Sequence, residues 1–147
     1  MDMWPESIGQ NIALKPPSAI LKEQAALLGN KTKNIVTAEV KNRGESGLGS
    51  FSYNFNLVAP AYGYRYKLFQ VWYGLEYYPI HFTVEEEIEK VLSEHLSALP
   101  IPTQPAHREV KHPVAKSEEE FLEILGKIFS AEKTIRIINA LIAESEA

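Results

Sequence analysis

The strongest constraint on the fold is a strand pattern that recurs between residues 34 and 84. From residue 51 the sequence FSYNFNL alternates without interruption between large apolar and small polar side chains. A period of two is typical of a β-strand with one buried face. Related patterns, separated by short segments, occur at residues 34–42, 64–73 and 77–84. Short connections make neighbouring strands run antiparallel, so we predict a four-stranded meander.

Helical periodicity flanks this region on both sides. Helices are predicted at residues 17–28, 86–99 and 117–129, followed by a last helix through about residue 143, and a fifth strand at residues 108–114. Thr83 with Glu86, and Ser117 with Glu120, have the spacing of a capping box at a helix start. The predicted fold is therefore α+β: an antiparallel sheet of four to five strands, with the N-terminal helix and the C-terminal helices packed on one face.

The length of 147 residues predicts one domain spanning residues 1–147. Residues 1–16 have no sustained period and are expected to form an extended arm. Trp4 is expected to dock the arm on its own domain, with a second subunit as the alternative. Residues 100–106 contain three prolines and predict a stiff connector. Neither a membrane span nor a signal sequence is visible, so we expect a soluble cytoplasmic protein that binds no membrane.

Composition removes most catalytic mechanisms. The chain has no cysteine, and Asp2 is the one aspartate among nineteen acidic residues. The chain therefore lacks the residues needed for a thiolate nucleophile, a cysteine-bound metal, an aspartate-containing triad or a typical calcium loop. Phosphate-binding glycine loops are absent from the sequence as well. We accordingly assign no catalytic residue, metal ligand or cofactor, and favour a protein that is not an enzyme.

The most concentrated candidate for a binding surface is a run of tyrosines mixed with basic residues. All seven tyrosines lie between residues 53 and 78. Tyrosine combines a large rigid contact area with a polar tip, which suits recognition surfaces. Cross-strand aromatic packing is the structural alternative. The candidate binding residues are Tyr53, Tyr62, Tyr64, Arg65, Tyr66, Lys67, Trp72, Tyr73, Tyr77 and Tyr78.

Glu39-Val40-Lys41 on the first predicted strand places a carboxylate and an ammonium on one face, where they can hold a metal ion and orient a water molecule. This E-x-K segment resembles half of the motif of the PD-(D/E)xK nucleases. The resemblance covers three residues and lacks the upstream aspartate. Glu23 on the preceding helix is the substitute that the chain offers. An exposed pair of opposite charges is the structural alternative.

The histidines give a weaker signal. His107 and His112 are five residues apart, a spacing that places them on opposite faces of a strand. A metal site built from His81, His95 and a glutamate requires the fold to bring them together. The acidic runs that begin at Glu85 and at Glu118 fit the positive ends of helices.

Three functions follow in order of preference. The first is a non-enzymatic protein-interaction module, in the manner of small accessory, inhibitor or immunity proteins, that uses the tyrosine-rich sheet face. The second is a module that binds nucleic acid or a small ligand on the same face, with Arg65 and Lys67 as anion contacts; the net charge of −4 favours a protein partner over nucleic acid. The third is the metal-dependent nuclease. Self-association is also predicted, through the N-terminal arm or through Ile135, Ile138 and Ile142.

Overall fold

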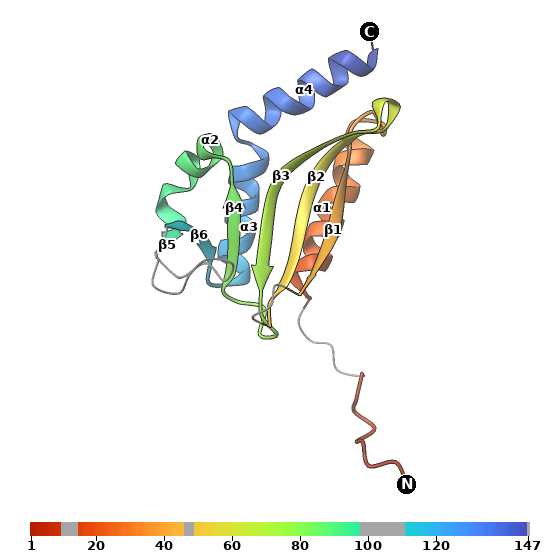
Figure 1. The fold of residues 1–147 in the computed structure, drawn as a ribbon, viewed down its shortest axis with the longest axis vertical. Coiled ribbons are helices and arrows are strands. Elements are labelled where there is room, and N and C mark those ends of the chain that lie inside the picture. The colour runs from red at the N-terminus through yellow and green to blue at the C-terminus, as the bar shows by residue number, and fades with distance from the viewer. Residues whose placement is uncertain (10–14, 46–48, 98–110, 147) are drawn as a thin grey trace.

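The computed structural model describes residues 1–9, 15–45, 49–97 and 111–146, and it has the predicted α+β architecture (Figure 1). In chain order the elements are α1 (Pro17–Lys31), β1 (Thr37–Glu45), β2 (Phe51–Ala59), the 3-10 helix η1 (Pro60–Tyr62), β3 (Tyr64–Tyr73), β4 (Ile80–Val84), α2 (Glu86–Glu89), the 3-10 helix η2 (Lys90–His95), β5 (Leu96–Ser97), β6 (His112–Ala115), α3 (Glu118–Phe129) and α4 (Glu132–Glu146).

The antiparallel meander is confirmed as β1 to β4. The strand order of the sheet is β1-β2-β3-β4-β6-β5, with every neighbouring pair antiparallel. The sheet thus has six strands where the sequence predicts four to five. The additional strand, β5, is two residues long, and a period of two cannot be recognised over that length.

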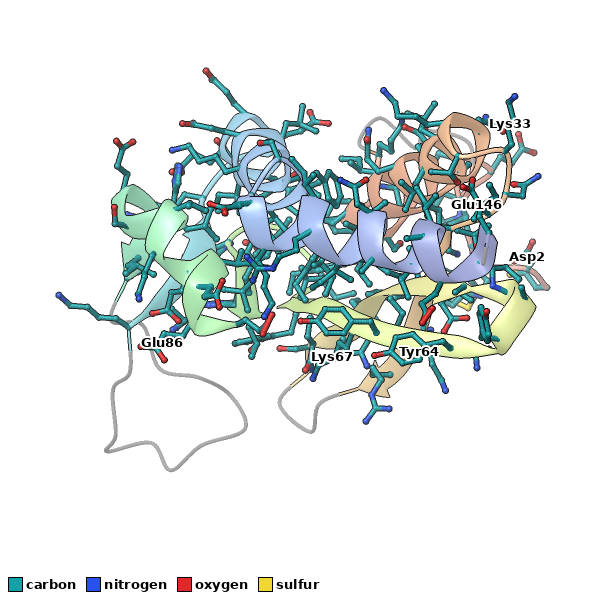
Figure 2. All side chains as sticks on the ribbon, turned by 90° about the horizontal axis from the view of Figure 1, so that it is seen from above. Asp2, Lys33, Tyr64, Lys67, Glu86 and Glu146 are labelled. Carbon is teal, nitrogen blue, oxygen red and sulfur yellow. The ribbon has the colours of Figure 1, made fainter. Side chains whose placement is uncertain are left out.

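The helices α1, α3 and α4 lie on one side of the sheet, as predicted (Figure 2). We call the opposite side the open face. On the helix side, the rings of Phe55 and Phe69 stack with their centroids 5.0 Å apart, and Phe129 from the end of α3 contacts both. Phe82 and Phe121 extend this aromatic layer toward β6. The core is therefore a sandwich of one sheet face against helices, with aromatic rings in its centre.

A β-bulge in β3 decides which face each of its side chains takes. The pairing of β3 with β2 skips Leu68, so that Leu68 and Phe69 both enter the core. A bulge of this kind shifts the alternation of the strand by one residue. Strict alternation predicts Trp72 on the same face as Tyr66. The shift instead places Trp72 on the open face, together with Lys67.

The helix predicted at residues 86–99 is shorter than expected. The α-helical part ends at Glu89, and the chain continues as η2 to His95 and then as β5. Inside η2, Leu92 has a non-helical backbone and a buried side chain, so the turn that ends the helix is fixed by the core. The helix start also differs, since its N-cap is Glu85 and not Thr83.

The N-cap bond of the second capping box is confirmed at the start of α3, while its reciprocal bond comes from the residue before the N-cap. The hydroxyl of Ser117 accepts a hydrogen bond of 3.2 Å from the backbone N–H of Glu120. The carboxylate of Glu120 in turn accepts one of 3.0 Å from the backbone N–H of Lys116. These two bonds fix the first turn of α3 and the direction of the Glu120 side chain.

The N-terminal arm does not dock on its own domain over the part that the structure describes. Trp4 is 76% exposed, and residues 1–9 lead away from the sheet and helices (Figure 1). The expectation that Trp4 packs against the domain is therefore wrong. The predicted connector at residues 100–106, His107 and the first part of the predicted strand at residues 108–114 lie outside the described residues; the strand itself is found as β6, at residues 112–115.

Candidate functional site

An apolar groove lies between α1 and α4 on the helix side of the sheet. Its floor is formed by Phe55 and Leu57 of β2, and its volume is about 640 Å³. The rim is open to solvent, because Leu27 of α1 is 55% exposed and Ile135 of α4 is 46% exposed. Other lining residues are Leu28 and Lys31 of α1, Phe129 of α3, and Ile138, Asn139 and Ile142 of α4.

The groove is left open because α4 is held by a hydrogen bond near each end, while Ile137, Ile138 and Leu141 between these bonds are only partly buried against the core. At its start, the buried hydroxyl of Thr134 donates a 2.6 Å hydrogen bond to the carbonyl oxygen of Ile128. Near its end, the phenol of Tyr62 in η1 donates a 2.6 Å hydrogen bond to the carbonyl oxygen of Glu144. Thr134 is the buried residue of this helix, and the apolar residues that follow it remain partly open. The helix α4 therefore lies over the sheet with its apolar side chains only partly buried.

Four of the tyrosines predicted to bind a partner take part in core packing: Tyr73 is buried in the core, and Tyr53, Tyr77 and Tyr78 are half-buried against it. Tyr53 and Tyr73 stack with their ring centroids 6.0 Å apart, and Tyr77 meets Tyr73 edge-on. Tyr78 meets Phe121 of α3 edge-on. Burial raises the pKa of Tyr73 and that of Tyr78 to about 12. These residues fit the packing alternative weighed for the tyrosine run.

The other three tyrosines lie at the end of η1 and in the first residues of β3, and two of them, Tyr62 and Tyr66, make polar contacts. The phenol of Tyr66 donates a short hydrogen bond to the carboxylate of Glu85, and burial together with this bond raises its pKa strongly. Glu85 in turn forms an ion pair with Lys133 of α4. Tyr62 and Tyr64 are exposed. Tyr66 and Tyr62 thus connect the sheet to α4, and a binding role for the exposed rings stays a prediction.

On the open face, Trp72 stacks on two histidines. Its ring centroid is 5.4 Å from that of His81 and 5.7 Å from that of His112. The Nδ1 atom of His81 is 2.9 Å from the Nε2 atom of His112. Burial, with repulsion from His112, lowers the pKa of His81 to about 4. Both the indole and the His112 side chain are buried, so these two rings are shielded from solvent although they lie on the open face of the sheet.

The residues of the E-x-K segment do not converge with Glu23. Glu39 faces away from α1 on the open face, where it accepts hydrogen bonds of 3.0 Å from Asn56 and 2.7 Å from Arg65. These bonds hold the pKa of Glu39 below its usual value. Glu23 lies on α1, on the other side of the sheet, and pairs with Lys15. Among the described residues, the two carboxylates that the nuclease hypothesis needs are therefore separated.

The fold also separates His81 from His95. While His81 joins His112, the imidazole of His95 at the end of η2 lies against α3, between the carboxylates of Glu120 and Glu123. Glu94, His95 and Glu123 each offer one ligand atom, and these atoms lie within 4.8 Å of one another. The sequence reveals His95 and Glu94 as neighbours, but their meeting with α3 depends on the turn at Leu92.

Comparison of the chain with models of protein families, with curated proteins and with solved structures found no match. No described helix has the length and apolar character needed to cross a membrane. The groove contains Ile135, Ile138 and Ile142, which the sequence indicates as an association surface, but it also needs Leu27 and Phe129, which the sequence does not single out.

Proposed function

We propose that this chain is a protein-interaction module that takes an amphipathic helix of a partner protein into the groove between α1 and α4. The observation that carries the proposal is the open apolar groove with its exposed rim residues Leu27 and Ile135. A groove floored by a sheet and walled by two helices suits a third helix, whose apolar face then completes the layer.

The dimensions of the groove support a helical occupant. The α4 wall runs from Ile135 to Ile142, which is about 10 Å at a rise of roughly 1.5 Å per residue. This length matches about two turns of a partner helix with apolar residues at positions i, i+3 or i+4, and i+7. Gln24, Lys31 and Asn139 at the groove provide polar groups for the edge of such a helix.

The partner is still a protein, as inferred from the sequence, but its main contact surface is the groove between α1 and α4 and not the tyrosine-rich sheet face. The basic residue Arg65, on which the nucleic-acid alternative relies, already pairs with the carboxylate of Glu39 at 2.7 Å. Tyr62 and Tyr66 contribute by holding the α4 side of the groove, through Glu144 and through Glu85. We therefore assign these two tyrosines to the support of the interface.

Selection from a displayed library of amphipathic helical peptides tests the proposal. Bound peptides are expected to share apolar anchors at helical spacing, and Leu27→Glu and Ile135→Glu are expected to weaken their binding. Each substitution places a charge where about 1–2 kcal/mol of apolar burial is gained on binding, so the loss is roughly tenfold or more. Leu122→Glu is the matched control, because Leu122 is on α3, is 49% exposed and lies outside the groove.

Three results would contradict this function. The first is a set of selected peptides without helical spacing, or one that Leu27→Glu and Leu122→Glu weaken equally. The second is a small apolar molecule retained in the groove and detected by native mass spectrometry, since the volume also lies in the range of about 300–1,000 Å³ for small-ligand pockets. The third is a dimer that Ile135→Glu disrupts, which would make a second copy the occupant.

A further inference from the structure

We propose that Glu94, His95 and Glu123 form a binding site for a divalent transition-metal ion of the Zn²⁺ type, at the junction of η2 with α3. The site is separate from the groove and does not depend on the proposed interaction. Glu94 and His95 are the last residues of η2, and Glu123 is on the facing side of α3. An ion held by all three would join the two elements.

The state of His95 is the observation that points to a ligand. Its side chain is 7% exposed, and its Nε2 atom is buried without a hydrogen-bond partner among the described residues. A buried nitrogen of this kind is costly, since it has lost water and gained no partner. The nearest carboxylate oxygen, Oε1 of Glu123, is 3.6 Å away, too far for a hydrogen bond. The imidazole nitrogen therefore points at a carboxylate that it does not bond.

The separation of these two atoms fits a shared metal ion. Ligand atoms about 2.1 Å from one tetrahedral ion lie roughly 3.4 Å from each other. The 3.6 Å between Nε2 of His95 and Oε1 of Glu123 is close to that value. The third ligand, from Glu94, lies within 4.8 Å of both and is on a side chain that is largely exposed and free to adjust. Three protein ligands would leave a fourth position for water.

Glu120 lies beside the other imidazole nitrogen of His95, where a metal-binding histidine commonly has a carboxylate partner. Its Oε2 atom is 3.7 Å from Nδ1 of His95, on the opposite side of the imidazole from Glu123. The other oxygen, Oε1, is fixed by the backbone N–H of Lys116. A histidine that binds a metal through one nitrogen commonly donates its other N–H to a carboxylate, which sets the tautomer. At 3.7 Å the two atoms do not form a hydrogen bond, so we expect Glu120 to act as a positioning residue for His95 by closing on Nδ1 when the ion binds.

Lys127 is the group with which an ion has to compete. Its ammonium is 3.6 Å from the carboxylate of Glu94 and 3.6 Å from that of Glu123. The ammonium thus provides the positive charge that these two carboxylates would otherwise receive from a bound cation. Its long flexible stem allows it to move into solvent when a divalent cation binds. Nitrogen and carboxylate ligands together favour Zn²⁺ over Mg²⁺ or Ca²⁺, which prefer oxygen alone.

Calorimetric titration of Zn²⁺ into the untagged full chain at neutral pH, with a Mg²⁺ titration beside it, tests the site. We expect one Zn²⁺ ion per chain and no comparable binding of Mg²⁺. Glu94→Gln and Glu123→Gln remove ligands from exposed positions and are expected to weaken binding at least about tenfold, as is Glu120→Gln through the loss of orientation. Glu119→Gln, which removes an exposed charge from the same helix outside the cluster, is expected to leave binding unchanged.

Lys127→Gln separates a metal site from a purely structural ion-pair cluster. If Zn²⁺ competes with the ammonium, this variant binds Zn²⁺ more tightly than the natural chain. No binding at millimolar Zn²⁺, binding that Glu94→Gln and Glu123→Gln leave unchanged, or weaker binding by Lys127→Gln would each overturn the proposal. A site that is lost with His81→Asn would overturn it too, because it would assign the ion to the pair of His81 with His112.

Discussion

Replacement of His81 by asparagine is expected to flatten the acid dependence of stability. The Nδ1 atom of His81 lies 2.9 Å from Nε2 of His112, and its ring stacks on Trp72. Asparagine places a polar atom near the position of Nδ1 but does not titrate. The variant therefore keeps a hydrogen-bonding group toward His112 and loses the proton linkage.

The size of the effect follows from the pKa of His81, which burial and His112 lower from 6.5 to about 4. The unfolded chain binds this proton near pH 6.5, whereas the folded chain binds it only near pH 4. The stability that the neutral imidazole contributes is therefore complete above pH 6.5 and is lost as the pH falls toward 4. The shift sets an upper limit of about 3 kcal/mol, which partial solvent exposure of His81 reduces to about 2 kcal/mol.

Urea denaturation at a series of pH values from 7.5 to 4 measures this dependence. The natural chain is expected to lose about 2 kcal/mol more of its unfolding free energy over this range than His81→Asn does. Loss of stacking on Trp72 lowers the stability of the variant at every pH, so the slope and not the absolute value is decisive. Equal slopes for the two chains, or an NMR titration in which His81 ionises near 6.5, would refute the reasoning.

Two further predictions concern tyrosine ionisation and helix capping. In an alkaline absorbance titration, Tyr73 and Tyr78 are expected to ionise near pH 12, because burial raises their pKa. The stability linked to these two phenols is present below pH 10 and is lost as the pH rises toward 12. Tyr73→Phe and Tyr78→Phe are therefore expected to reduce that loss. Ionisation of all seven tyrosines near pH 10 in the folded chain would contradict this prediction. Ser117→Ala removes the cap of α3 and is expected to lower the unfolding free energy by about 1 kcal/mol. The exposed Ser93→Ala is its control, and equal effects of the two in urea denaturation would show that the cap contributes little.

Local patterns were sufficient to predict most of the secondary structure. The alternation in β2, and the capping box of Ser117 with Glu120, depend on contacts between residues close in the chain or on the general pleat of a strand. Such features are visible in sequence because they need no knowledge of distant partners. The same holds for the α+β class, which follows from the order of the elements.

Predictions failed where a distant partner decided the local structure. The bulge at Leu68 depends on pairing with β2, and it moved Trp72 to the face opposite the one that alternation indicates. The helix after β4 ends early because Leu92 is drawn into the core. Neither event has a local signal, since each is stabilised by burial against residues far along the chain.

The candidate sites, like the secondary structure, combine features that the sequence predicts with features that depend on distant contacts. Residue types alone set the available chemistry: tyrosines in a short meander, four histidines, glutamate as almost every acidic group, and no thiol. The packing of the elements determines how these groups are used: it places Tyr73 in the core, the phenol of Tyr62 against the carbonyl oxygen of Glu144 in α4, and His95 beside Glu123. The physical reason is that residue types and periods are properties of the chain, whereas grooves and ligand sets arise from contacts between elements that only the packed fold brings together.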